Sequence, residues 1–157
     1  MRGALVPALG NLGFLLQVNG ILIIAPLILA VLLNESSAMI AFAFTVLISL
    51  VSGLMLTNFF RRPEMSFESV SLLIPLTYVS LGLVGSIPYV IIGQGIFSGE
   101  NIWNIFIDGY FESISGFTTT GLTLIPNIET VPKSLILFRG LTQWLGGLSI
   151  VYLMILF

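Results

Sequence analysis

Long stretches without a charged side chain constrain the fold of this chain more than any other feature. Charge-free stretches hold the 32 residues between Arg2 and Glu35, the 25 between Glu35 and Arg61, the 31 between Glu68 and Glu100, and the 18 after Arg139. A helix needs roughly 20 apolar residues to cross a bilayer core about 30 Å thick. The first three stretches each exceed that length, so the chain is expected to be an integral membrane protein with several spans.

Composition supports this expectation and excludes several classes of function. Hydrophobic residues make up 57% of the chain and charged residues only 8%, whereas soluble domains carry about 25% charged residues. The absence of Cys and His excludes thiolate zinc sites, disulfides and nucleophiles activated by His. A formal charge of −2 with five basic residues argues against a nucleic-acid partner. Neither an enzyme nor a cofactor-binding protein is expected.

Four transmembrane helices are predicted, at about residues 9–33, 37–60, 69–95 and 134–157. The first apolar stretch is too long for a signal peptide, whose apolar region has about 7–15 residues. The third contains Pro75 and Pro88, which membrane helices tolerate when their neighbours satisfy the freed carbonyls. Its two tyrosines, Tyr78 and Tyr89, are expected near the two membrane interfaces, where aromatic residues are enriched.

The few basic residues predict the orientation of the chain. Arg2 and the pair Arg61-Arg62 are separated by two spans, so they belong on the same side, which the positive-inside rule assigns to the cytoplasm. We read the Arg pair as a topology anchor, with a lipid-headgroup site as the alternative. The outer loops then hold most of the acids, a bias that weakly concentrates cations. The chain is thus expected to be a multi-pass protein of the plasma membrane with a cytoplasmic N-terminus.

Residues 102–121 have the layout of a re-entrant pore loop. Residues 102–116 form a predicted helix of about 22 Å, too short to span, and a Thr-rich loop ending in Gly121 follows. In a cation filter, backbone carbonyls replace the hydration shell of the ion, and a helix C-terminus nearby favours a positive charge. Gly121 can adopt backbone angles that are closed to other residues. The expected fold is all-α, with four transmembrane helices, one re-entrant pore helix and a filter loop.

An alternative interpretation of this loop stays open. Residues 117–121 also suit a polar surface loop after a helix C-cap, with Gly116 or Gly121 as the capping residue. The acid-bearing half-span before the loop and the full span after it favour the pore loop.

Three charged residues are expected to support the loop. Asp108 and Glu112 are four residues apart and therefore share a helix face, where they brace the loop or draw ions to its mouth. Arg139 is expected to form a bracing salt bridge with Asp108, Glu112 or Glu129, because a positive side chain on the pore axis would repel a permeating cation. The pair Gly146-Gly147 is expected to permit close helix packing.

Several motifs together resemble a known family. The segment YFESISGFTTTGLT at 110–123 precedes PKS at 132–134, FR at 138–139 and QWLGGL at 143–148. In this order and spacing they resemble the first pore loop and the next helix of the TrkH branch of the Trk/Ktr/HKT superfamily of potassium transporters. That family has four membrane–pore-loop–membrane repeats, and the TrkH branch adds two helices before the first. By this resemblance, residues 1–62 are the two added helices, 63–157 are the first repeat, and repeats two to four are expected to be missing.

The resemblance implies uptake of K⁺, and in some members Na⁺, through a channel-like filter. Thr118, Thr119, Thr120 and Gly121 would supply one quarter of the filter oxygens through their backbone carbonyls. The implied partners are the remaining three repeats, a second copy in a dimer, membrane lipid and a cytosolic nucleotide-binding regulatory subunit. Two other interpretations stay open: a stand-alone pore subunit that forms a homotetramer, and a structural membrane subunit without a pore.

Overall fold

Helices are the regular secondary structure of the residues that the structure describes. The computed structural model describes residues 2–60, 65–97 and 101–155. The elements are α1 (Arg2–Leu32), α2 (Ser36–Phe59), α3 (Phe67–Ile92), η1 (Gly93–Gly95), α4 (Ile102–Phe117), η2 (Ile128–Thr130) and α5 (Lys133–Ile155). No strand occurs in these ranges, which confirms the all-α class. The expected domain boundary at 62/63, the pair Arg61-Arg62, Glu100 and the side chain of Arg2 lie outside the described residues.

Within the described part of the chain, three helices are long and apolar enough to cross a membrane. These candidate spans are Ala4–Leu32, Ser36–Phe59 and Phe67–Gly95, and they correspond to the first three predicted helices. Helix α3 runs uninterrupted through Pro75 and Pro88, as expected. Helix α1 begins at Arg2 rather than at residue 9, because Ala4 and Ala8 are buried and tertiary packing extends the helix. A fourth span at α5 stays a prediction.

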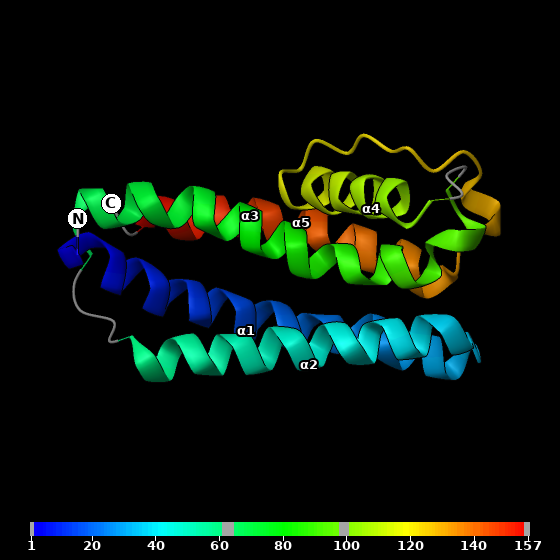
Figure 1. Cartoon of the computed structure of the whole chain (residues 1–157), viewed down its shortest axis with the longest axis horizontal. Helices are drawn as coiled ribbons and strands as arrows, with labels where there is room; N and C mark the ends of the chain where they lie inside the picture. Colours follow the sequence, from blue (N-terminus) through cyan, green and yellow to red (C-terminus); the bar gives the residue numbers. More distant parts are fainter. Residues whose placement is uncertain (1, 61–64, 98–100, 156–157) are drawn as a thin grey trace.

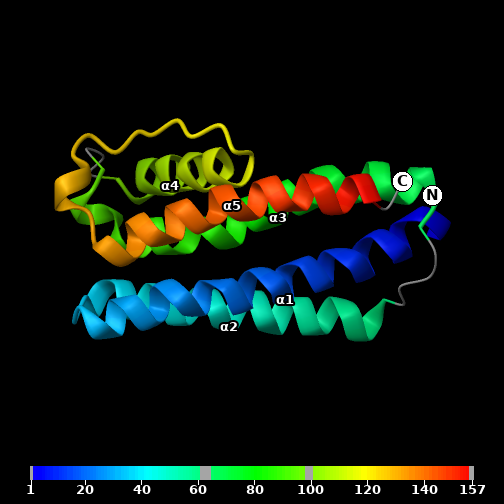
Figure 2. The ribbon, with the colours of Figure 1, turned by 180° about the vertical axis from the view of Figure 1, so that it is seen from behind.

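The long helices lie with their axes roughly aligned and form two layers (Figures 1 and 2). Helices α1 and α2 lie side by side in one layer, and α3 and α5 lie in the other. Helix α4 packs mainly on α3 and also contacts α5. Helix α1 begins and α5 ends at one end of the bundle, whereas the α1–α2 corner and the start of α5 share the opposite end. The short helix α4 lies toward this second end.

Two groups of buried side chains hold the layers together. In one group the ring of Phe138 lies 5.5 Å from that of Phe42 and 5.9 Å from that of Tyr89, measured between centroids. The other group includes Leu12, Leu73 and Phe117, the last residue of α4. Tyr89 is fully buried, enclosed by this aromatic packing, and the expected position of Tyr78 and Tyr89 near the membrane interfaces stays a prediction.

Helix α1 ends in a tight turn in which one residue is left-handed. The amide of Asn34 donates to the Val31 carbonyl at 3.2 Å, and that of Glu35 donates to the Ala30 carbonyl at 2.9 Å. This is the hydrogen-bond pattern of a Schellman motif. Asn34, with φ of +54°, occupies its left-handed position.

The carboxylate of Glu35 joins this corner to the beginning of α5. It accepts hydrogen bonds from the backbone N–H of Lys133 at 2.8 Å and of Ser134 at 3.2 Å, and from the Ser134 hydroxyl. The first N–H groups of a helix have no partner within it, and the helix dipole favours a negative charge there. The α1–α2 corner therefore fixes where α5 begins.

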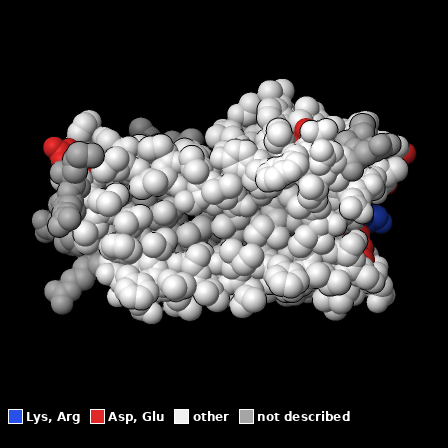
Figure 3. All heavy atoms as spheres, viewed as in Figure 1, with Lys and Arg blue, Asp and Glu red and all other residues white. Residues whose placement is uncertain are grey.

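Charged side chains lie mostly at the ends of the molecule. In the space-filling view, the broad face over α1 and α2 shows no acidic or basic atom between its two ends (Figure 3). Many large apolar side chains on these helices are exposed, including Ile21, Ile28, Phe44 and Leu47. This surface suits contact with lipid or other apolar protein surface.

Candidate functional site

The chain enters and leaves the α4 region at the same end of the bundle. Helix α4 ends part-way along α3 and α5, and the segment after it runs back beside α4 (Figures 1 and 2). Contacts with the helix fix this return: Ser115 Oγ donates to the Leu122 carbonyl at 2.7 Å, and Glu112 Oε1 accepts from the Leu124 N–H at 2.5 Å. Residues 121–125 therefore run antiparallel to α4. They are called the return strand below, although they form no β-ladder.

The turn at the end of α4 places Thr119 in a left-handed conformation. The amide of Thr119 donates to the Gly116 carbonyl at 2.9 Å, and that of Thr120 donates to the Ser115 carbonyl at 3.0 Å, again a Schellman motif. Thr119 has φ of +58°, which is an outlier for a β-branched residue. The alternative interpretation named Gly116 or Gly121 as the capping residue. In the structure Gly116 lies inside the helix, and Thr119 takes the left-handed capping position.

Gly121 adopts the backbone geometry that the sequence predicts for it. Its φ is +74°, a conformation that glycine adopts without steric penalty. Its amide donates to the Ser115 carbonyl at 3.2 Å. Gly121 thus completes the reversal between the helix and the return strand.

The threonines before Gly121 present oxygen atoms at the surface. Thr118 Oγ1 donates to the Ile114 carbonyl and lies 2.8 Å from Thr120 Oγ1, while Thr119 and Thr120 are exposed. Within the described ranges no group donates to the carbonyl oxygens of Thr119 and Thr120. These two oxygens are available to a ligand that accepts electron pairs, such as a cation.

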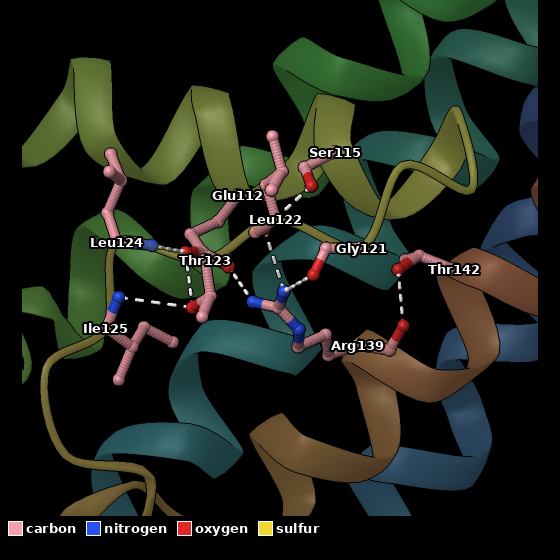
Figure 4. Close-up of polar contacts among 9 residues, drawn as sticks. All are labelled: Glu112, Ser115, Gly121, Leu122, Thr123, Leu124, Ile125, Arg139 and Thr142. Atoms are coloured by element: carbon pink, nitrogen blue, oxygen red, sulfur yellow. Dashed lines mark hydrogen bonds and ion pairs between the residues drawn. The ribbon is translucent and has the colours of Figure 1, made fainter.

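The return strand is held by a buried ion pair between Glu112 and Arg139 (Figure 4). Glu112 is fully buried, and its Oε1 also accepts from Thr123 Oγ1 at 2.8 Å. Arg139 Nη2 donates to the carbonyls of Gly121 at 3.2 Å and Leu122 at 2.9 Å. The pair connects α4, the return strand and α5 through charge-assisted hydrogen bonds, which are stronger than neutral ones.

The ion pair identifies which of three acids contacts Arg139. Of the candidates Asp108, Glu112 and Glu129, only Glu112 forms a salt bridge within the described part of the chain. Asp108 is half-buried and Glu129 is exposed. Asp108 therefore does not join Glu112 in holding the return strand, although both lie on α4.

Helix α5 packs directly against the C-terminal end of α4. A Cβ atom added at Gly146 would lie 2.0 Å from the carbonyl oxygen of Phe117, whereas one at Gly147 would meet nothing within 4 Å. Thr142, one turn earlier on α5, lies against Gly116. The expected close packing thus applies to Gly146 and not to Gly147.

Sequence reasoning misses two hydroxyl contacts in this region. Ser115 and Thr123 both lie in the recognised motif, but the motif assigns neither a role. Ser115 is three residues after Glu112, a spacing that puts both on one helix face, so the periodicity of α4 contains the signal. Thr123 Oγ1 also accepts from the Ile125 amide at 3.1 Å, which nothing in the sequence pattern indicates.

Acidic side chains do not form a divalent-metal centre in the described residues, because no group of three metal-ligating side chains comes together there. Any cation at this site would be bound mainly by backbone and hydroxyl oxygens.

Comparisons with known proteins give consistent matches. No family model matches the chain. It is 32% identical over 146 residues to the Trk system potassium uptake protein TrkH of Halomonas elongata, and 33% identical over 127 residues to TrkH of Escherichia coli K12. An uncharacterized cation transporter of Methanocaldococcus jannaschii is 31% identical over 142 residues. These alignments cover 90%, 80% and 90% of this chain, respectively.

A solved structure is similar over almost the whole chain. The crystal structure of the potassium transporter TrkH from Vibrio parahaemolyticus matches with a TM-score of 0.76 at 30% sequence identity, covering 93% of this chain and 30% of that one. The chain spans 28%, 25% and 28% of the length of the three relatives above. The similarity therefore concerns about a quarter of those proteins.

Proposed function

Because this chain belongs to the TrkH family, we propose that it takes part in potassium uptake across the plasma membrane and supplies one wall of a cation filter. The ligands would be the backbone carbonyls of Thr118, Thr119, Thr120 and Gly121. In this structure the Thr118 carbonyl accepts from Thr119 Oγ1 at 2.6 Å and the Gly121 carbonyl from Arg139 Nη2 at 3.2 Å, so the carbonyls of Thr119 and Thr120 are the two open to an ion. The relatives are named as transporters, which supports a transport role rather than an enzymatic one. K⁺ is the proposed cargo, with Na⁺ as a competing ion.

One observation carries this proposal: free carbonyls lie directly beside carbonyls that are held in place. Thr119 and Thr120 expose carbonyls without a donor in the described ranges, while Arg139 and Ser115 hold the carbonyls of Gly121 and Leu122. In a selective filter, backbone carbonyls replace the hydration shell of the ion.

Helix α4 adds an electrostatic contribution to this site. Its C-terminus adjoins the Thr-rich turn, and the end of a helix carries roughly half a negative charge. A K⁺ ion at the Thr119 and Thr120 carbonyls would lie near that end. The positive charge of Arg139 is compensated by Glu112, while its Nη2 donates to the carbonyls of Gly121 and Leu122.

Residues 118–121 would form only one wall of the pore, so further protein is needed to enclose it. We propose that three other repeats supply the remaining walls, with α5 as the fourth span and the N-terminus in the cytoplasm. A dimer and a cytosolic nucleotide-binding regulatory subunit are extensions of the same proposal. A homotetramer of this chain is the alternative source of the walls, and the mass of the complex in mild detergent distinguishes the two.

The decisive experiment compares two glycine substitutions in the protein as its gene encodes it, expressed in a bacterium that lacks its own potassium uptake. Gly121→Ser puts a side chain at a residue with φ of +74°, whereas Gly140→Ser, the control, adds one on α5 where a Cβ meets nothing within 4 Å. Gly121→Ser should reduce K⁺ over Na⁺ selectivity by about tenfold, equivalent to about 1.4 kcal/mol. Gly140→Ser should leave selectivity unchanged.

Two outcomes would refute the filter assignment. Unchanged selectivity with Gly121→Ser would place the filter elsewhere. Assembly defects without any change in ion flux, across all substitutions of residues 118–121, would indicate a structural membrane subunit without a pore.

A further inference from the structure

The last residue of α4, Phe117, is held between α3 and α5 by two glycines. On α5, a Cβ atom added at Gly146 would lie 2.7 Å from the carbonyl carbon of Phe117 and 3.2 Å from its Cα, and it would overlap the carbonyl oxygen. On α3, a Cβ atom added at Gly85 would lie 2.8 Å from Cε2 of the Phe117 ring. Neither position can take a larger residue unless a neighbour moves. Gly85 and Gly146 are called the Phe117 seat below.

The two contacts of the seat differ in what would have to move. Gly146 meets backbone atoms of Phe117, so a side chain there would separate the end of α4 from α5. Gly85 meets the outer edge of the Phe117 ring and the hydroxyl of Ser113, which both belong to side chains. The ring is 1% exposed and belongs to a buried cluster with apolar side chains of α1 and α3. Because protein interiors are close-packed, the ring has little space to turn away.

The seat lies directly before the filter threonines, and the first part of the loop is tied to α4. The amide and the hydroxyl of Thr118 both donate to the Ile114 carbonyl, each at 2.8 Å. The amide of Thr120 donates to the Ser115 carbonyl at 3.0 Å. These bonds join the threonines to the last turn of α4, so a movement of Phe117 carries them with it.

The end of the loop is tied to α5 as well. Arg139, two turns before Gly146 on α5, donates from Nη2 to the Gly121 carbonyl at 3.2 Å. The separation of α4 from α5 at the seat therefore affects where the carbonyls of Thr119 and Thr120 lie relative to that of Gly121.

We propose that the Phe117 seat sets the geometry of the filter, which makes Gly146 and Gly85 positioning residues for ion selectivity. This inference rests on the proposed function. Selectivity in carbonyl filters is attributed to the size of the cavity or to the number of coordinating carbonyls, and a shift of α4 against α5 alters both. Gly146 has the larger role, because it contacts backbone that no change of rotamer can move.

The first test compares two neighbouring glycines in the protein as its gene encodes it, expressed in a bacterium that lacks its own potassium uptake. Gly146→Ala adds a Cβ against the Phe117 backbone, whereas Gly147→Ala, the matched control, adds one that meets nothing within 4 Å. Per amount of folded protein, Gly146→Ala should lower K⁺ over Na⁺ selectivity by about tenfold, equivalent to about 1.4 kcal/mol. Gly147→Ala should leave it unchanged. Equal selectivity of the two variants overturns the proposal.

The second test uses the difference between backbone and ring contacts, and it decides the matter if Gly146→Ala does not fold. Gly85→Ala should lower selectivity by a few-fold. Adding Phe117→Leu should restore it, because leucine lacks the ring atom that the new Cβ meets. The same second change should not restore Gly146→Ala, since every residue has the backbone atoms that collide there. If Phe117→Leu does not rescue Gly85→Ala, or rescues both variants equally, the seat does not act as proposed.

These readouts separate a positioning role from packing alone and from failure of the filter itself. If Gly121→Ser alters selectivity while Gly146→Ala and Gly85→Ala lower only the melting temperature in detergent, the seat serves packing and the filter stands. If Gly121→Ser leaves selectivity unchanged as well, the proposed function fails, and the positioning role fails with it.

Discussion

The corner between α1 and α2 and the corner between α4 and the return strand share one hydrogen-bond pattern but differ in residue type. Asn34 takes the left-handed position at the first corner and Thr119 takes it at the second. Asparagine visits this conformation readily, because its side chain forms local hydrogen bonds. A β-branched residue does not. At the first corner, Asn34 suits the left-handed backbone conformation. At the second corner, Thr119 is strained, and contacts elsewhere in the molecule hold it in this conformation.

The acids beside these corners differ in the same way. Glu35 is half-buried and binds two backbone amides at the start of α5. Glu112 is fully buried and binds Arg139 together with the return strand. Solvent stabilises the negative charge of Glu35, whereas the negative charge of Glu112 is stabilised by Arg139. The molecule thus concentrates strain and buried charge at the proposed filter and keeps the distant corner free of both.

Breaking the buried ion pair should have the largest effect. Arg139→Met leaves the carboxylate of Glu112 buried without its cation, which costs about 3–5 kcal/mol. Glu112→Gln should cost less, because the Arg139 side chain is 18% exposed and water can reach it. Unfolding free energies in detergent measure both. If Glu112→Gln proved the more damaging variant, the buried carboxylate would not be the dominant charge at this site.

Removing the cap on α5 should have an intermediate effect. Glu35→Ala deprives two N–H groups of their acceptor and should cost about 0.5–2 kcal/mol, the usual range for a lost helix cap. Hydrogen exchange at Lys133 and Ser134 should accelerate, because these amides lose their protection. The exposed acid Glu129 offers the control, since Glu129→Ala should leave exchange at the start of α5 unaltered. Slow exchange in the Glu35→Ala protein would contradict the capping role.

Exchanging the left-handed residues should have the smallest effect, with opposite signs at the two corners. Thr119→Asn should stabilise the protein by about 1 kcal/mol, and Asn34→Thr should destabilise it by a similar amount, given the 1–2 kcal/mol penalty of this conformation. Thermal unfolding measures both changes. Thr119→Asn should also lower K⁺ selectivity, because the strained turn sets the neighbouring carbonyls. Changes of the same sign would show that the two turns do not differ in strain.

Much of the helical layout can be predicted from the sequence, because charged residues mark the ends of the apolar stretches. Helices α2 and α3 begin and end within three residues of the predicted limits, counting η1 with α3. The positive φ of Gly121 also follows from residue type. These features depend on local sequence, where the number of apolar residues or the absence of a Cβ decides the outcome.

Features that depend on distant residues cannot be predicted in this way. Nothing in the pattern selects Glu112 over Asp108 or Glu129 as the partner of Arg139, because all three acids are the right type. Propensity assigns the left-handed turn to glycine, yet tertiary contacts impose it on Thr119. Tyr89 matches the rule for membrane-interface aromatics, but packing against Phe138 buries it.

The cap that Glu35 places on α5 has a consequence for the order of assembly during synthesis. Glu35 precedes Lys133 by 98 residues, which a ribosome adds in about 5–20 s at 5–20 residues per second. During that interval α1 and α2 have already been synthesised, but the Lys133 and Ser134 amides that the Glu35 carboxylate binds have not. When α5 emerges, its first turn meets a preformed acceptor that sets its register. The α1–α2 corner, which is made earlier, thus acts as the template on which α5 docks.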